Sequence, residues 1–160
     1  MLNYERGSEW RRWDLHIHTP GTLKNDQYEG KAIEEKWDNF YDTIAQYIGD
    51  GTDPLRTIEV IGITDYLSID NYNRVMKDKR LPESIKLVLP NVELRMIPLA
   101  KTAPVNIHCI FDPDYADDLE SRFFSKLKFS FKYSSYSASH SELVRLGKDY
   151  ESDKVLTDAQ

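Results

Sequence analysis

The chain has 160 residues, of which 40% are hydrophobic and 30% charged, and its formal net charge is -6. This length and composition predict one globular domain over residues 1–160 with a sizeable core. The acidic balance excludes a protein built as a whole to bind polyanions, although a local basic patch is compatible with it. A single cysteine, Cys109, excludes a disulfide scaffold within the chain. No apolar stretch has the length of a signal peptide or a membrane span, so we expect a cytoplasmic protein.

The first half of the chain alternates strand and helix patterns. Residues 13–18, "WDLHIH", alternate with period two and predict a strand with Asp14, His16 and His18 on one face. Apolar residues at helical spacing over 33–48 predict a helix, which the glycines that follow would end. Residues 57–65 are rich in β-branched side chains and predict a strand covered on both faces. A further helix is predicted over 69–77.

The second half continues less regularly. Residues 84–98 predict one or two strands broken at Pro90, and residues 105–111 predict another strand. An amphipathic helix is predicted over 115–127. Ser139 and Glu142 have the spacing of a capping box and predict a short helix that ends near Gly147. Residues 151–160 lack an apolar face and predict a loosely ordered tail.

Strands that alternate with helices predict an α/β fold with a largely parallel sheet. Functional groups of such folds gather at the carboxyl ends of the strands. Each of the four strand segments carries a potential metal ligand: His16 and His18 end the first, Asp65 ends the second, Glu93 lies in the third after Pro90, and His108 lies in the fourth.

Taken singly, each of these residues has an ordinary structural explanation. A strand histidine pair is often a plain polar face, a histidine in an apolar strand is often a hydrogen-bonded core residue, and Asp65 fits a turn or helix start. Their occurrence together favours a metal-binding site, because three of the four histidines lie on predicted strands along with the two acids Asp65 and Glu93. Imidazole and carboxylate are ligands that Zn²⁺, Mn²⁺ and Fe²⁺ accept.

The segments "WDLHIHT", "GITDYLSIDNY", "PNVEL" and "VNIHCIF" together resemble the first motifs of the PHP (polymerase and histidinol phosphatase) domain superfamily. They are most similar to the N-terminal PHP domain that is fused to SMC-like or AAA-type ATPases in bacteria. The resemblance covers most of residues 10–150.

This resemblance implies a distorted β/α barrel, incomplete in this chain, that holds Mn²⁺, Zn²⁺ or Fe²⁺ and hydrolyses phosphoesters. It assigns His16 and His18 to the first motif, Asp65 to the second, the bridging carboxylate to Glu93, and the following histidine to His108. The first four would be catalytic as well as metal-binding. Arg95, and Arg12 or Arg11 beside the first strand, are candidate phosphate contacts, with an ordinary surface charge as the alternative.

The chain departs from the family pattern at two points. Tyr66 follows Asp65 where the family commonly has a histidine, and no closing Asp-x-His motif follows His108. His140, at a predicted helix start, is expected to face solvent. A β/α barrel also needs about 200 residues or more, so we expect this chain to be part of a larger assembly or protein.

Three functions follow as hypotheses. The first is a metal-dependent phosphoesterase acting on nucleic acid phosphodiesters beside an ATPase partner, to which Lys128 and Lys132 among aromatic residues could contribute a strand-contacting face. The second is a catalytically degenerate PHP module with a docking or regulatory role. The third is a small-molecule phosphatase of the histidinol phosphatase type.

Overall fold

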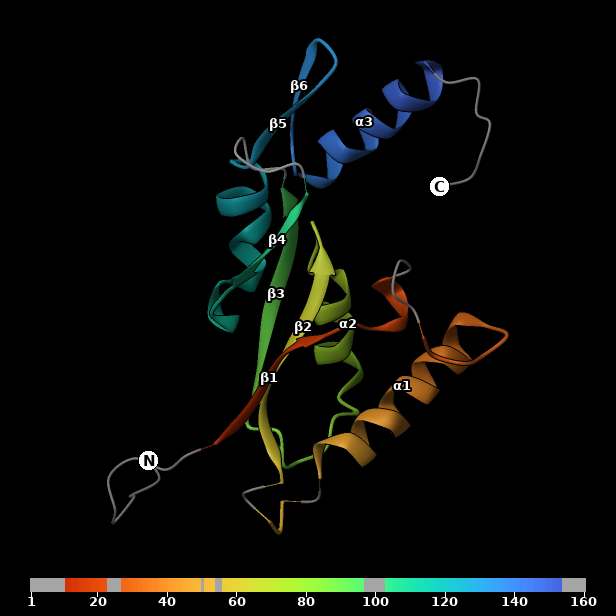
Figure 1. Ribbon diagram of the computed structural model, residues 1–160, viewed down its shortest axis with the longest axis vertical. Coiled ribbons are helices and arrows are strands. Elements are labelled where there is room, and N and C mark those ends of the chain that lie inside the picture. The colour runs from red at the N-terminus through yellow and green to blue at the C-terminus, as the bar shows by residue number, and fades with distance from the viewer. Residues whose placement is uncertain (1–10, 23–26, 50, 54–55, 97–102, 154–160) are drawn as a thin grey trace. The chain divides into compact units, whose positions relative to one another are not determined.

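The computed structural model describes residues 11–22, 27–49, 51–53, 56–96 and 103–153, and the chain divides into two compact units, Met1–Pro113 and Asp114–Gln160 (Figure 1). The single domain expected over residues 1–160 stays a prediction. The elements of the first unit are β1 (Arg12–Ile17), η1 (Pro20–Thr22), α1 (Ile33–Ile48), β2 (Ile58–Tyr66), α2 (Asp70–Asp78), β3 (Leu87–Met96) and β4 (Val105–Ile110).

The first unit is a mixed α/β structure around one four-stranded sheet with the order β1-β2-β3-β4, and the expected α/β class is confirmed. The first three strands are parallel, whereas β4 runs antiparallel to β3, so the prediction of a largely parallel sheet fails at this edge. A parallel crossover needs a dozen or more residues. Only residues 97–104 join β3 to β4, which suits an antiparallel return.

β3 runs through Pro90 without the break that the sequence predicted. The Pro90 carbonyl accepts a hydrogen bond from the Phe111 N–H on the β4 side, at 3.0 Å. The missing N–H of Pro90 therefore also faces that side, where the β4 ladder ends at the pair Asn91–Ile110. A proline is tolerated at such a position because no ladder hydrogen bond is lost.

The predicted helices over 33–48 and 69–77 are confirmed as α1 and α2. Glu35 accepts a hydrogen bond from the Lys31 N–H at 2.7 Å and so satisfies a free donor before the first turn of α1. The two helices are joined by polar and cation–π contacts: Arg74 lies 4.3 Å from the centroid of Trp37, and the Tyr41 hydroxyl donates to Asp78 at 2.9 Å. Their buried apolar residues, together with those of the eight buried positions of β2, form the core of this unit.

The second unit differs most from its sequence prediction. The helix expected over 115–127 is instead a 3-10 helix η2 (Pro113–Asp118) followed by a π-helix η3 (Glu120–Phe124). The strands β5 (Lys128–Phe131) and β6 (Ser134–Ser137) form an antiparallel hairpin. The helix α3 (His140–Asp153) starts after Ser139 as predicted but continues through Gly147. Residues 154–160 of the expected tail lie outside the described residues.

None of the helices in the described ranges combines the length and the apolar composition that crossing a lipid bilayer requires.

β1 carries a bulge that includes His16, just before the strand ends at Ile17. Asp14 pairs with Ile61 and Ile17 pairs with Ile63, so two residues of β1, Leu15 and His16, oppose the single residue Gly62 of β2. An ideal Cβ on Gly62 would lie 2.4 Å from the Leu15 carbonyl oxygen. Only a glycine at position 62 lets the bulged backbone approach this closely.

We predict that Gly62→Ala lowers the free energy of unfolding by about 1–3 kcal/mol or more, because backbone atoms of β1 must move away from the added methyl group. Denaturant unfolding followed by circular dichroism measures the change.

The matched control is Gly147→Ala in α3, where an added Cβ meets no atom within 4 Å. This change should raise stability by about 0.5–1 kcal/mol through helix propensity. Equal effects of the two substitutions would show that the close approach at Gly62 carries no energetic weight.

Candidate metal centre

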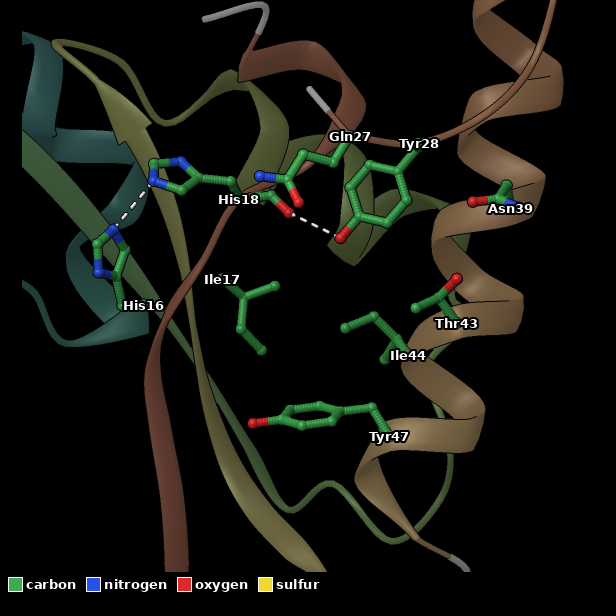
Figure 2. A pocket seen from close by; sticks show the side chains of 9 residues that line it. All are labelled: His16, Ile17, His18, Gln27, Tyr28, Asn39, Thr43, Ile44 and Tyr47. Atoms are coloured by element: carbon green, nitrogen blue, oxygen red, sulfur yellow. Dashed lines mark hydrogen bonds between the residues drawn. The ribbon is translucent and has the colours of Figure 1, made fainter. Parts of the chain in front are cut away.

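The bulged end of β1 brings two imidazoles together. The Nε2 atoms of His16 and His18 lie 2.9 Å apart, as Figure 2 shows with a dashed line. Both face the Glu93 carboxylate of β3, whose Oε2 lies 3.5 Å from His16 Nε2 and 3.6 Å from His18 Nε2. These three side chains come from two strands that are not neighbours in the sheet, since β2 lies between them.

Glu93 is the buried member of this group. Its side chain is 1% exposed, against 17% for His18 and 51% for His16. The Oε2 atom of Glu93 is buried and has no hydrogen-bond partner among the described residues. An ionised carboxylate is costly to bury without compensation, so this oxygen marks a position where a cation would be strongly stabilised.

The three ligand atoms also pass a test of metal geometry. Nitrogen and oxygen ligands about 2.0–2.2 Å from one Zn²⁺ lie about 2.9 Å apart at a right angle and about 3.4 Å apart at the tetrahedral angle. The separation of 2.9 Å matches the right-angle value, and the separations of 3.5 and 3.6 Å slightly exceed the tetrahedral value. A circle through the three atoms has a radius of about 1.9 Å, so one point at bonding distance from all three exists.

His108 of β4 extends the group. It pairs with Glu93 in the antiparallel register, and its ring centroid lies 4.4 Å from that of His16. His16, Glu93 and His108 each offer one ligand atom, and these three atoms all lie within 4.8 Å of one another. The structure therefore gathers four of the five predicted ligands, His16, His18, Glu93 and His108, into one cluster.

The surroundings of His18 favour its neutral, metal-binding form. Burial lowers the pKa of His18, the neighbouring His16 lowers it further, and Glu93 opposes this shift. The Tyr66 ring stacks on the His18 ring with centroids 5.8 Å apart, and the Tyr28 hydroxyl donates to the His18 carbonyl at 3.1 Å. Tyr66 thus lies beside the cluster, at the position where the family pattern has a histidine.

Asp65, the fifth predicted ligand, is engaged elsewhere. Its carboxylate accepts hydrogen bonds from the Asn71 N–H at 2.9 Å, from the Asn71 side-chain amide and from the Thr22 hydroxyl at 3.3 Å. Burial raises the pKa of Asp65, and these hydrogen bonds oppose the shift. They anchor the carboxylate to the first turn of α2. A metal-binding role of Asp65 stays a prediction.

The predicted phosphate contacts differ in position. Arg95 lies two residues after Glu93 and so shares its face of β3, where its Nε donates to Asn106 Oδ1 at 3.2 Å and its side chain is exposed. Arg12 lies at the start of β1 and donates to the Arg56 carbonyl at 2.9 Å. Arg95 is therefore the better placed of the two for a ligand at the cluster.

A pocket of about 690 Å³ lies between β1 and α1 (Figure 2). Ile17 and Ile44 form an apolar part of its wall, and Tyr47, whose hydroxyl donates to Asp14 at 3.0 Å, closes one end. His16 and His18 also line it, but Glu93 and His108 do not. The pocket therefore adjoins the two histidines from the side of α1 and does not reach Glu93 or His108.

Asn91 is the neighbour of the cluster that the sequence analysis missed. Its side chain is 1% exposed, and its amide nitrogen contacts the Leu15 carbonyl at 2.6 Å and His108 Nδ1 at 3.0 Å. The available signal was its position two residues before Glu93, which places both side chains on one face of a strand.

No protein-family model, curated protein or solved structure matches this chain. The metal centre accordingly rests on the arrangement of the chain's own residues.

Proposed function

We propose that this chain binds a divalent metal ion, Mn²⁺, Zn²⁺ or Fe²⁺, between His16, His18, Glu93 and His108 and hydrolyses phosphoester bonds there. The observation that carries the proposal is the triangle of two imidazole nitrogens and one buried carboxylate oxygen, which has no hydrogen-bond partner among the described residues and lies close enough to both nitrogens for one ion to reach all three atoms. The motif resemblance to the PHP superfamily supports the reaction type.

The same resemblance supports nucleic acid phosphodiesters as the substrate and an SMC-like or AAA-type ATPase as the partner, in the same or another chain. It also supports a PHP-type barrel, to which the four-stranded sheet would contribute one part. The acidic net charge of -6 makes the local cation Arg95 important to this proposal, because a nucleic acid needs a positive contact at the reacting phosphate.

Each side chain has a role that follows from its burial. A bound divalent ion supplies an acidified water and neutralises charge on phosphoryl oxygens. Glu93 provides the fixed negative charge and, at 1% exposure, closes the buried side of the site. His16, at 51% exposure, marks the side open to solvent, from which a substrate arrives. Arg95 would exchange Asn106 for a phosphate oxygen.

A second candidate is a metal-binding module with a docking or regulatory role and no hydrolysis. Two observations favour it: the Asp65 carboxylate is held by Asn71 and Thr22, and Tyr66 stacks on His18 where a further imidazole would lie. In this case the protein would bind the metal ion but would not hydrolyse a substrate.

Metal binding is the first prediction of this proposed function. The purified chain should hold at least one Zn²⁺ or Mn²⁺ tightly, measured by isothermal titration and by elemental analysis after dialysis. Glu93→Gln and His16→Ala should each weaken binding about 10-fold or more, because each removes one side of the ligand triangle.

His140→Ala is the matched control, since His140 is an exposed histidine of α3 in the second unit. Equal loss in His140→Ala and His16→Ala would place the ion outside the proposed centre.

Hydrolysis is the second prediction. With Mn²⁺ added, the chain should cleave a single-stranded DNA, a double-stranded DNA, an RNA or an aryl phosphate, and Glu93→Gln should lower the rate at least 100-fold. Tight metal binding with no turnover on any of the four substrates would favour the docking module, and turnover on the aryl phosphate alone would favour a small-molecule phosphatase.

Tyr66→His is the third prediction. Tyr66 pairs with Glu93 in the sheet and its ring stacks on His18, so an imidazole at position 66 would lie beside the ligand triangle. We expect tighter metal binding or a second bound ion, seen by titration. Tyr66→Phe keeps the stacking ring without a ligand and should leave affinity and stoichiometry unchanged; a gain in this variant would contradict the reasoning.

A further inference from the structure

Asn91 contacts both the β1 bulge and the β4 histidine of the proposed centre. It lies in β3 on the same face as Glu93, and its amide nitrogen is 2.6 Å from the Leu15 carbonyl oxygen, which belongs to the bulge that presents His16. The same nitrogen lies 3.0 Å from Thr64 Oγ1 and 3.0 Å from His108 Nδ1, and the amide oxygen lies 3.3 Å from His108 Nδ1.

The Leu15 contact fixes the orientation of the amide. A backbone carbonyl can only accept, so the atom of Asn91 that faces it at 2.6 Å must be the nitrogen. The reversed amide would place two oxygens against each other. One of the two amide protons is thereby committed to Leu15, and one proton is left for Thr64 or His108.

The remaining choice decides the tautomer of His108. If the second amide proton goes to Thr64 Oγ1, His108 Nδ1 must carry a proton and donate it to the Asn91 oxygen. Both amide protons, the amide oxygen and His108 Nδ1 are then paired, and the 3.0 Å approach of the Asn91 nitrogen to Nδ1 is a contact rather than a hydrogen bond. If the second proton goes to His108 Nδ1 instead, the buried Asn91 oxygen has no donor among the described residues. A buried acceptor without a donor is costly, so complete pairing favours the first arrangement.

We propose that Asn91 is a positioning residue that holds His108 with its proton on Nδ1, so that Nε2 keeps its lone pair for the metal centre. Ligating histidines are commonly oriented in this way by a partner at the other ring nitrogen. Because the same amide also holds the Leu15 carbonyl, one side chain links the β1 bulge to the β4 histidine. The proposal rests on the proposed metal site for its functional meaning.

Thr64→Val gives the sharpest test, because it keeps the shape of a buried residue and leaves Asn91 in place. It removes the acceptor of the second amide proton, so that either arrangement leaves one group unpaired and the preference of the ring proton for Nδ1 should be lost. Asn91→Ala should also abolish the preference for Nδ1. Thr57→Val, another buried threonine of the first unit whose hydroxyl bonds the Asp53 carbonyl, is the matched control and should change nothing at His108.

The measurement is a long-range proton–nitrogen correlation spectrum of the metal-free whole chain, taken well above the ordinary histidine pKa of about 6.5. His108 in the unmutated chain should show a protonated Nδ1 and an unprotonated Nε2. Zn²⁺ affinity should fall about 10- to 100-fold in Thr64→Val and Asn91→Ala, with circular dichroism confirming that each variant is folded.

A protonated Nε2 on His108 in the unmutated chain would overturn the proposal, and that result needs no variant. So would an unchanged tautomer in folded Thr64→Val together with unchanged Zn²⁺ affinity. If the spectrum is as expected but the chain holds no ion, the proposed function fails and the assignment of the Asn91 hydrogen bonds stands. If the ion binds equally in every variant, the metal site stands and the positioning role fails.

Discussion

The buried carboxylate of Glu93 is the constraint around which the sheet is arranged. It is 1% exposed at the centre of four strands, where an uncompensated charge costs several kcal/mol. The side chains that approach its oxygen are imidazoles from β1, two strands away, and from β4, the adjacent strand. Imidazole is the one neutral group here that can either accept a proton beside the carboxylate or share an ion with it. His16, His18 and His108 all lie where they can meet this requirement.

Two irregularities of the sheet place those imidazoles beside Glu93. The bulge opposite Gly62 sets the end of β1, and the antiparallel return of β4 places His108 directly across from Glu93. The predicted ligands His16 and His18 lie at the carboxyl end of β1, and Glu93 lies three residues before the end of β3. His108 reaches the same point by register instead, since its strand runs in the opposite direction.

The sequence predicted the parts of this arrangement that depend on local pattern. Alternation over residues 13–18 identified the histidine face, and the apolar runs identified β2, α1 and α2 nearly to the residue. The bulge could not be predicted from local pattern, because it depends on the close approach of Gly62 to the backbone of Leu15, 47 positions earlier in the chain. The strand break predicted at Pro90 was wrong for a similar reason. Pro90 breaks no strand pairing because the β4 ladder ends beside it, and local sequence does not show where that ladder ends. Asp65 carries the right chemistry for a ligand, but Asn71 and Thr22 compete for it through contacts that no strand pattern encodes.

The departures from the family pattern reduce the number of ligands that the proposed metal centre offers. Tyr66 contributes a stacking ring in place of an imidazole, and Asp65 is held at the first turn of α2, so the described residues offer ligands for fewer ions than a complete set would. Catalytic zinc sites commonly have three protein ligands and one position open to water. His16, His18 and Glu93 form such a set, with its exposed side at His16. Because the activation of water needs an open position on one ion, the proposed hydrolysis depends on this single set of three ligands, of which His16 is the most exposed.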